Sequence, residues 1–398
     1  MIVNNINFKN FKIKKKLNIA KKEFNSLISD YHKNKNNILN TLSKDYNNNS
    51  NSKIIKKFKR KSFFRIIGMG GSILGSEAIY SFLKKKIIKN FSFINNLQNN
   101  INLNKNKKTQ VNIIISKSGN TLETICNSNI LLKDNQKNII ISELQDNYLN
   151  KLAADLKSDI IEHKNYIGGR YSVLSEVGMI PAELMGLDVI KFKQFNYLIK
   201  NKIFVKELLS NVQSIYLNVK KGKFLSFILN YDPLSEPFFK WYQQLVSESL
   251  GKKSNGVIPV ISTMPKDNHS LMQYYLDGQP KGFYTFFFSH QENTRKINHK
   301  KILEPYKFLK GKKLSEIIYS QNIATQNVFN SKKIPFRSFE ILSKDEKSLG
   351  TLFTFFILET ILVGRLLKVN PFDQPAVELI KKETKKILLK KRTKNNFR

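Results

Sequence analysis

The sequence predicts an α/β protein built from two doubly wound parallel sheets flanked by helices, with an N-terminal helical arm and a C-terminal helix. Three observations lead to this prediction. Short apolar runs alternate with segments of helical periodicity, turns rich in Gly and Ser directly follow two of the runs, and the alternation recurs in the second half of the chain. The 398 residues are enough for two cores, since a domain commonly holds about 150 residues.

Changes in composition divide the chain into four expected regions. Residues 1–60 are rich in Lys and Asn and form the expected helical arm. Residues 61–192 form a first α/β domain, and residues 193–368 form a second one. Residues 369–398 form the C-terminal helix, in which Pro375 suits the first turn.

The expected strands are short apolar runs, and the expected helices show an apolar rhythm near 3.6 residues. The strands are residues 63–67, 111–115, 138–142, 257–262, 283–288 and 334–341. The helices are residues 234–250, 268–276 and 314–329. The apolar stretch 351–364 is short for a membrane span and contains Glu359, so we expect a buried helix and no membrane association.

The composition narrows the class of protein. The formal net charge of +38 raises the possibility of a nucleic-acid partner. However, the Lys residues are scattered among Asn and Ile, which share A/T-rich codons, and no nucleic-acid-binding motif is visible, so we expect no nucleic acid. The single cysteine, Cys126, excludes an internal disulfide framework. Together with the lack of a visible signal peptide, this predicts a cytoplasmic protein.

The run SKSGNTLET at residues 116–124 lies between an expected strand and an expected helix. The hydroxyls of Ser116, Ser118 and Thr121 can donate hydrogen bonds, and the helix N-terminus adds backbone donors and a partial positive charge. Gly119 allows a sharp turn. This pattern favours a site for a phosphorylated small molecule. The alternative is an ordinary loop in which Ser, Thr and Glu123 cap the helix.

A second turn, GMGGS at residues 68–72, also joins an expected strand to a helix. It resembles a dinucleotide fingerprint only loosely, and no acidic residue stands where a ribose would need one. Gly71 and Ser72 would let the backbone approach a sugar or phosphate. The alternative is a tight strand–helix turn without a ligand.

Two charged residues are candidates for catalysis. Arg170 follows two glycines in GGRYSVLSEVG and could stabilise an oxyanion. Glu248 lies near the end of an expected helix in QQLVSESLGK and could be a general base. A surface arginine and a solvated helical glutamate are the corresponding alternatives.

Three further candidates lie towards the C-terminus. His269 stands at an expected helix start in KDNHSLMQYYLDGQ and could move protons. Gln374 and Lys381 are seven residues apart in NPFDQPAVELIKK, so on a helix they would lie near one face, two turns apart. The alternatives are a capping-region histidine and an amphipathic helix with exposed lysines.

Taken in order, these motifs resemble the glucose-6-phosphate isomerase (phosphoglucose isomerase) family. The resemblance rests on GMGGSILG, SKSGNTLET, GGRYSVLSEVG, VSESLGK, KDNHSLMQYYLDGQ and NPFDQPAVELIKK, which extend from Gly68 to Lys382. It implies two sugar-isomerase (SIS) domains. The chain departs from the family where Asn120 replaces a common Thr, and where ESLGK and DNHS replace the usual ESNGK and GQHS-like segments.

The resemblance also implies a reaction and a role for each candidate. The reaction is the reversible isomerisation of glucose 6-phosphate and fructose 6-phosphate in glycolysis and gluconeogenesis, through a cis-enediolate, without a cofactor or metal. Glu248 would move the proton between C2 and C1, Arg170 would stabilise the enediolate, and His269, with Lys381, would assist ring opening. The substrate-binding positions would be Gly71, Ser72, Ser116, Ser118, Thr121 and Gln374.

In the family, the histidine reaches the site from a second subunit, so the resemblance implies a homodimer in which His269 crosses between subunits. Two alternatives to the main function stay open at this point. One is a dual phosphoglucose/phosphomannose isomerase that uses the same base. The other is a non-catalytic SIS protein that binds sugar phosphates, against which the complete set of proposed chemical groups argues.

Overall fold

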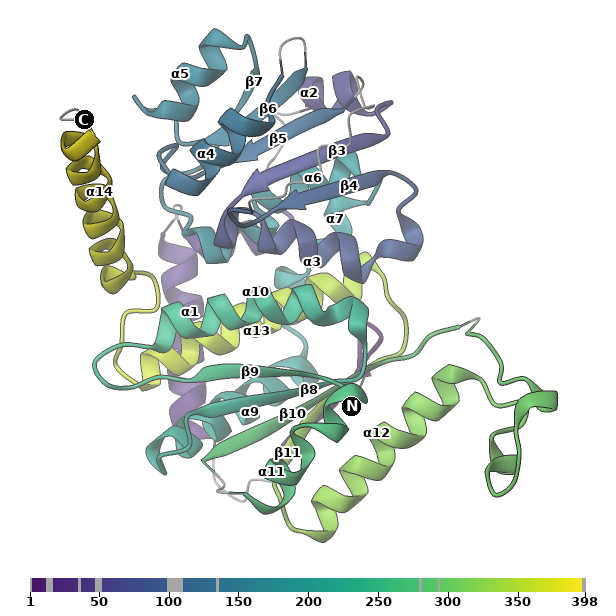
Figure 1. The fold of residues 1–398 in the computed structure, drawn as a ribbon. Coiled ribbons are helices and arrows are strands. Elements are labelled where there is room, and N and C mark those ends of the chain that lie inside the picture. The colour runs from purple at the N-terminus through teal and green to yellow at the C-terminus, as the bar shows by residue number, and fades with distance from the viewer. Residues whose placement is uncertain are drawn as a thin grey trace.

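The computed structural model describes residues 2–11, 17–34, 37–46, 52–98, 110–133, 136–278, 281–292 and 294–395. Within these residues the chain forms two sheets, one above the other in Figure 1, with helices between and around them. This architecture confirms the predicted fold class. The boundaries of the four expected regions stay a prediction.

The first sheet is parallel throughout, in the strand order β4-β3-β5-β6-β7. Its strands are β3 (Phe63–Gly68), β4 (Asn90–Ile94), β5 (Val111–Ile115), β6 (Lys137–Ser142) and β7 (Asp159–Glu162). The associated helices are α2 (Ser52–Phe58), α3 (Leu74–Phe82), α4 (Leu122–Leu131), α5 (Tyr148–Asp155) and α6 (Glu176–Leu184).

Helices cover both faces of this sheet. Neighbouring residues of a strand point to opposite sides, so each strand packs with a different set of helices on each face. Ile67, Ile114 and Ile140 pack with side chains of α4 and α5. Ile66 and Ile113 belong instead to the large core that includes α3 and α6. The mostly apolar runs in β3, β5 and β6 are therefore those of strands buried on both faces.

The second sheet has the order β1-β2-β11-β10-β8-β9. Its strands are β1 (Ile2–Val3), β2 (Ile6–Lys9), β8 (Leu225–Asn230), β9 (Ile258–Thr263), β10 (Gly282–Ser289) and β11 (Phe336–Ile341). The helices of this half are α1 (Asn18–Lys33), α7 (Val189–Phe192), α8 (Phe195–Leu198), α9 (Lys202–Lys220), α10 (Glu236–Leu250), α11 (Met272–Asp277), α12 (Leu314–Ser331) and α13 (Glu346–Leu366).

The N-terminal segment differs from the expected helical arm. Helix α1 is present, but β1 and β2 precede it, and β2 pairs antiparallel with β11. The second sheet is therefore mixed at this edge. Ile6 and Phe8 are buried, while the intervening polar residues alternate with them. This two-residue period is that of a strand, although the surrounding Lys and Asn obscure it in the sequence.

The two halves share one core. It contains residues of α3 and α6 from the first half and of α9, α10 and α13 from the second. Helix α13 is long and apolar enough to cross a membrane, but 94% of its apolar window is buried inside the protein. That burial confirms the buried helix that the sequence predicts for this stretch.

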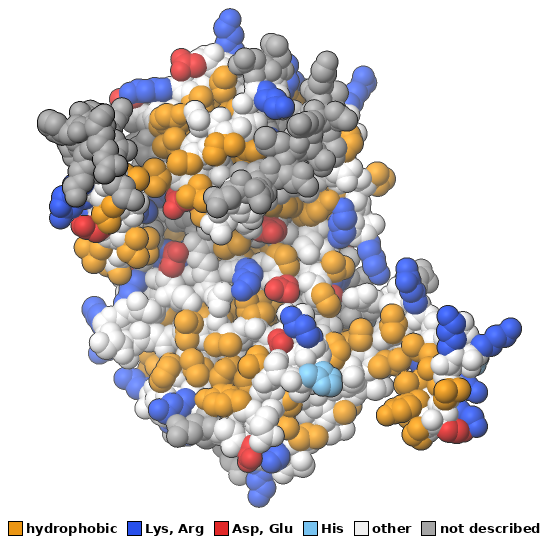
Figure 2. All heavy atoms as spheres, viewed as in Figure 1, with side chains coloured by type: hydrophobic (Ala, Val, Ile, Leu, Met, Phe, Trp, Pro, Cys, Tyr) orange, Lys and Arg blue, Asp and Glu red, His pale blue; other side chains and the backbone are white. Residues whose placement is uncertain are grey.

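Helix α14 (Pro375–Asn395) lies apart from this body (Figure 1). It begins at Pro375, as expected. Its side chains that the structure describes are mostly exposed, including the apolar Leu379 and Ile380. Figure 2 shows Lys and Arg side chains dispersed over the visible face, whereas several acidic side chains lie at the waist between the two halves.

Candidate active site

The two Gly- and Ser-containing turns lie side by side at the carboxyl edge of the first sheet. Strands β3 and β5 are neighbours, and Gly68 at the end of β3 pairs with Ile115 at the end of β5. Each turn therefore leaves the sheet at the same level. Ligands of parallel α/β sheets bind at this edge.

The SKSGNT loop is pre-shaped by its own contacts. The hydroxyl oxygens of Ser116 and Thr121 lie 2.9 Å apart, within hydrogen-bonding distance, and Thr121 is the N-cap residue of α4. Gly119 has a φ of +65°, and a Cβ there would lie 2.1 Å from Oδ1 of Asn147. Only glycine fits this position without displacing Asn147.

Asn120 has a structural partner in this loop. Its Oδ1 accepts a hydrogen bond of 3.0 Å from the backbone N–H of Tyr148, and its own N–H donates to Oγ of Ser118 at 3.3 Å. The side chain therefore ties the loop to the start of α5. This role explains how Asn120 is accommodated in the loop.

The GMGGS turn packs directly against the arginine segment. A Cβ on Gly71 would lie 2.2 Å from the carbonyl carbon of Gly169, so glycine permits the close approach of two backbones. Gly70 has a φ of +53°, and a Cβ there would lie 2.7 Å from Nε2 of Gln244. Ser72 ends the same turn and is partly exposed. The turn, which connects β3 to α3 in the chain, thus also contacts Gln244 of helix α10.

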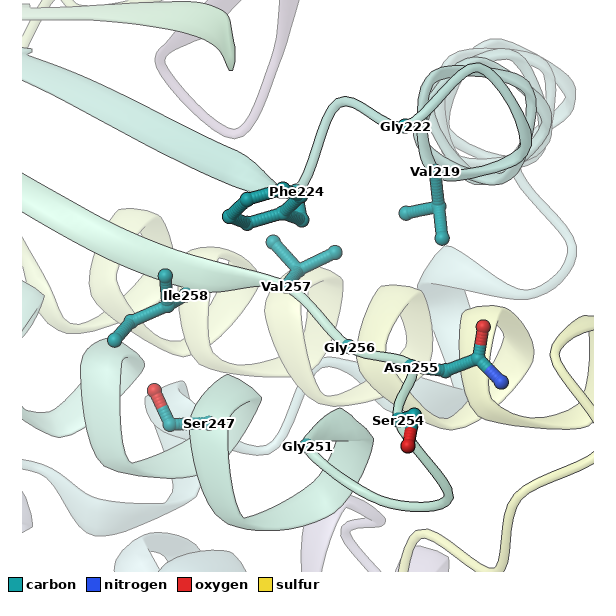
Figure 3. Close-up of a pocket in the computed structure, with 10 residues that line it drawn as sticks. All are labelled: Val219, Gly222, Phe224, Ser247, Gly251, Ser254, Asn255, Gly256, Val257 and Ile258. Atoms are coloured by element: carbon teal, nitrogen blue, oxygen red, sulfur yellow. The ribbon is translucent and has the colours of Figure 1, made fainter. Parts of the chain in front are cut away.

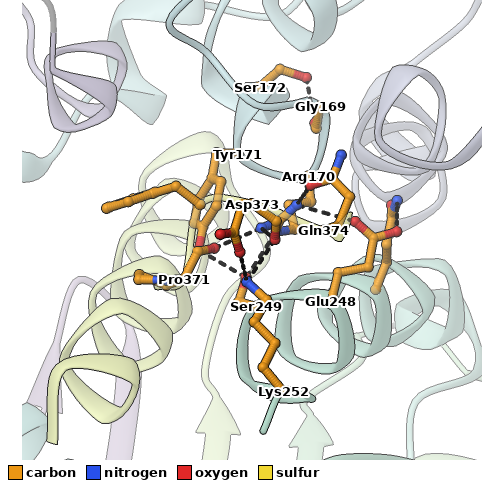
Figure 4. Close-up of polar contacts among 12 residues, drawn as sticks. Gly169, Arg170, Tyr171, Ser172, Glu248, Ser249, Lys252, Pro371, Asp373 and Gln374 are labelled. Atoms are coloured by element: carbon orange, nitrogen blue, oxygen red, sulfur yellow. Dashed lines mark hydrogen bonds and ion pairs between the residues drawn. The ribbon is translucent and has the colours of Figure 1, made fainter. Parts of the chain in front are cut away.

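Arg170 is buried, and each of its nitrogens has acceptors (Figure 4). Nε donates to Oγ of Ser249 at 2.8 Å, and Nη2 donates to the carbonyls of Pro371 at 2.6 Å and Asp373 at 3.0 Å. Nη1 donates to Oε2 of Glu248 at 3.2 Å and to Oε1 of Gln374. These bonds use all five N–H donors of the guanidinium.

Glu248 lies beside this arginine at the wall of a cavity. Its Oε1 accepts a hydrogen bond of 2.9 Å from Nε2 of Gln244, and its side chain keeps 28% of its surface exposed. The cavity has a volume of about 770 Å³ and extends along α10 and α3. A carboxylate that is oriented by two partners and still reaches a cavity is suited to proton transfer.

Hydrogen bonds from other parts of the chain also hold the backbone of the segment that contains Arg170. Nε1 of Trp241 donates to the carbonyl of Arg170 at 3.2 Å, and the hydroxyl of Tyr171 donates to the carbonyl of Pro371 at 2.9 Å. The buried ammonium of Lys193 donates to the carbonyl of Leu174. Burial lowers the pKa of Lys193 to about 7. Arg170 is therefore held at its backbone as well as at its guanidinium.

His269 lies at the opposite end of α10 from Glu248. The hydroxyl of Thr263, at the end of β9, donates to Glu236 at 3.3 Å, and the 3₁₀ turn Lys266–His269 comes next in the chain. Glu236 and Glu248 are twelve residues apart on α10, which is about 18 Å along the helix axis. His269 is exposed. The structure thus does not bring this histidine to the chain's own Glu248.

Lys381 is also separate from the Arg170 cluster. Its Nζ pairs with Oε1 of Glu378 at 2.7 Å on the same helix, and its side chain is 63% exposed. This ion pair lowers the pKa of Glu378. Gln374, by contrast, contacts Arg170 directly. Gln374 precedes α14, which begins at Pro375, so the expectation that it shares a helix face with Lys381 is wrong. Of these two candidates, the structure brings only Gln374 to the cluster.

The sequence reasoning missed several members of this cluster. Ser249 and Tyr171 are direct neighbours of residues that it did select, and the carbonyls of Pro371 and Asp373 belong to the segment that contains Gln374. The carbonyl acceptors belong to the backbone, so the identity of the side chains does not indicate them.

Among the residues that the structure describes, no group of three or more His, Cys, Asp or Glu is arranged to hold a metal ion.

Comparisons with known proteins match nearly the whole chain. The sequence profile described as phosphoglucose isomerase matches residues 36–397. A glucose-6-phosphate isomerase of Methanocaldococcus jannaschii is 33% identical over 80% of this chain and 82% of its own length. The enzyme of the same name from Mycoplasmopsis pulmonis is 30% identical over 88% and 89%.

Solved structures agree with the fold. A hypothetical protein of Thermus thermophilus matches with a TM-score of 0.81 at 20% identity, covering 93% of this chain and 95% of its own. A glucose-6-phosphate isomerase of Chlamydia trachomatis matches with a TM-score of 0.74 at 16% identity, covering 97% and 89%. With the match of the sequence profile and relatives of 30% identity or more, these findings mean that the chain belongs to the phosphoglucose isomerase family, whose members interconvert glucose 6-phosphate and fructose 6-phosphate.

Proposed function

We propose that the chain isomerises its hexose 6-phosphate through a cis-enediolate, with Glu248 as the base that moves a proton between C2 and C1. The observation that carries this proposal is the contact between the Glu248 carboxylate and the Arg170 guanidinium at the wall of the cavity. A base next to a fixed cation can remove a weakly acidic C–H proton, because the cation stabilises the oxygen charge that develops.

The hydrogen bonds of Arg170 suggest how substrate would engage it. The acceptors on Nη2 are backbone carbonyls, whereas those on Nη1 are the side chains of Glu248 and Gln374. Side chains can rotate away, but the carbonyls are part of a held backbone. The enediolate oxygens would therefore replace Gln374 on Nη1 and leave the bonds of Nη2 intact.

The phosphate would bind at the edge of the first sheet. Ser116, Ser118 and Thr121 supply hydroxyls there, α4 begins at Leu122, and Gly71 and Ser72 lie on the neighbouring turn. Binding the phosphate at a distance from C2 would position the open sugar chain, and positioning lowers the barrier of the proton-transfer step.

Ring opening would use His269, assisted by Lys381. We propose that this histidine comes from a second copy of the chain, so that the functional unit is a homodimer. The supporting observation is that α10 separates the chain's own His269 from Glu248. A two-fold axis near the middle of α10 would place the histidine end of each copy against the glutamate end of the other.

We also propose a cytoplasmic location, consistent with a single cysteine and a buried α13.

Mixed dimers test the base and the shared histidine together. Glu248→Gln and His269→Ala are each purified, unfolded, mixed in equal amounts and refolded, and fructose 6-phosphate turnover is measured. Each variant alone should be nearly inactive. The mixture should recover about a quarter of wild-type activity, because half of randomly paired dimers are mixed and each of these holds one intact site.

An inactive mixture that contains mixed dimers would mean that both residues serve the same chain's site. Differently tagged copies, isolated over two affinity columns, establish that mixed dimers have formed. The wild-type protein, refolded in the same way, gives the reference activity.

A further inference from the structure

The segment between α13 and α14 is held by two cations. Nη2 of Arg170 donates to the carbonyls of Pro371 and Asp373. Nζ of Lys252 donates to the Asp373 carbonyl at 2.6 Å and to the carbonyl of Asn370, and it pairs with the Asp373 carboxylate at 2.6 Å. Figure 4 shows both side chains converging on this segment.

One acceptor is shared between the two cations. The carbonyl oxygen of Asp373 receives a hydrogen bond from Arg170 and another from Lys252. The three N–H donors of the lysine ammonium match its three acceptors in this segment. Lys252 also lowers the pKa of the Asp373 carboxyl group, chiefly through its hydrogen bond to that carboxylate. The lysine therefore orients the Asp373 carbonyl, which also accepts a hydrogen bond from Arg170.

The position of this segment matters for the site because the next residues belong to it. Gln374 contacts Nη1 of Arg170, and α14, which carries Lys381, begins at Pro375. A shift of the segment would move the guanidinium, the glutamine and the start of the helix together.

Lys252 can reach the segment because of the loop that presents it. The loop directly succeeds α10, and a backbone bridge between Lys252 and Asn255 closes it. A cavity of about 480 Å³ lies against this loop, lined by Gly251, Ser254 and Asn255 among others (Figure 3). The lysine side chain itself is 13% exposed. It leaves the loop towards the 370–374 segment and contributes little to the hydrophobic core.

We infer that Lys252 is a positioning residue, which clamps the 370–374 segment against Arg170 and so sets the geometry of the arginine and of Gln374. This inference rests on the proposed role of Arg170 in stabilising the enediolate. Lys252 does not touch the reacting atoms. It acts on turnover through the Asp373 carbonyl, which it shares with Nη2, and through the position of the segment that leads into α14.

The test compares Lys252→Met with Lys253→Met, its neighbour in the same loop, which is exposed. Methionine keeps an unbranched side chain and removes the charge. Lys252→Met should lower kcat about tenfold or more with a smaller change in KM, since misplaced catalytic groups affect the transition state most. Lys253→Met should keep wild-type values. Lys252→Arg should recover a large part of kcat, because arginine restores a charged donor.

A second measurement monitors the segment itself. Amide hydrogen exchange over residues 370–390 should be faster in Lys252→Met than in the wild type and unchanged in Lys253→Met. Asp373→Asn should have a milder effect than Lys252→Met, because the backbone carbonyls remain available to the lysine. Thermal melting shows whether each variant folds.

Three results would overturn the inference: an unchanged kcat in folded Lys252→Met, equal losses in Lys252→Met and Lys253→Met, or unchanged exchange over residues 370–390. Failure of the proposed function has a different signature. If Arg170→Ala retains wild-type kcat, the role of the arginine is wrong, and the exchange measurement still decides whether Lys252 clamps the segment.

Discussion

The two ends of helix α10 differ in how completely one chain builds them. At the carboxyl end, Glu248 is oriented by Gln244 and Arg170, and every nitrogen of that arginine has an acceptor. Near the amino end, His269 is exposed. The residues proposed for proton transfer are thus pre-organised within the chain, whereas those proposed for ring opening await a partner or a movement.

The cause of this difference is burial. Arg170 is 2% exposed, and a buried guanidinium must have hydrogen-bond partners, because an unpaired buried charge costs several kcal/mol. His269 and Lys381 face solvent, where water satisfies their polar atoms. Exposed side chains can therefore stay without a protein partner, until a second copy of the chain or substrate binds, at little cost in folding stability. Substitutions at each end of the helix test this contrast.

The largest effect is expected for Glu248→Gln. The amide keeps the shape and can still accept from Gln244, but it cannot take a proton at neutral pH. Turnover should fall on the order of a thousandfold or more, while substrate still binds. The measurement is kcat in a coupled assay, with isothermal titration for binding. Near-normal turnover would remove Glu248 from the role of base.

Arg170→Ala should have the next largest effect. Loss of the cation removes stabilisation of the enediolate and frees the 370–374 segment, so kcat should fall about five hundredfold. The effect on KM should be smaller, because the stabilised charge exists mainly in the transition state. Thermal melting serves as the folding control. A change confined to KM would indicate that Arg170 binds only ground-state substrate.

His269→Ala should cost less than either change at the other end. Sugar rings also open slowly in water, so kcat should fall about a hundredfold rather than to nothing. The contrast sharpens with concentration, because activity that depends on a partner's histidine falls when dimers dissociate. Wild-type specific activity that is constant across dilution while the protein becomes monomeric would contradict the shared site.

The smallest effect is expected for Lys381→Met. The lysine is exposed and paired with Glu378, and exposed pairs contribute little to stability. We expect kcat to fall about tenfold or less with unchanged melting, which is below the loss typical of a group that itself transfers the proton and fits an assisting role. Lys382→Met, one position along the same helix, is the matched control. Equal losses in both variants would assign the effect to the general charge of α14.

Much of the fold results from local patterns. The apolar run at residues 111–115 became β5 without a change of boundary, and the run at 138–142 became β6 with one residue added. The stretch at 351–364 became the centre of α13. These elements are long or uniform enough for their own periodicity to define them. Strand β2 was missed because it depends on pairing with β11, more than 300 residues away.

The candidate site divides in the same way. The motif containing Ser116 and Gly119 indicates a turn at a strand end, because a left-handed turn and a helix start need particular residues. Nothing local indicates that Asn120 would bind the backbone of Tyr148, or that Lys252 would reach the carbonyl of Asp373.

The sequence alone determined the fold class, the two turns at the edge of the first sheet and the family to which the chain belongs. Each of these is written in short runs of residues whose conformational preferences act over a few positions. The tertiary structure decided which groups hold Arg170: Glu248 is 78 residues from it and Gln374 is 204 residues away. It also decided that the turn carrying His269 follows a strand end bonded to Glu236, at the amino end of α10, whereas Glu248 lies near the carboxyl end of that helix. Such contacts depend on how the chain closes its core, and no local pattern encodes that closure.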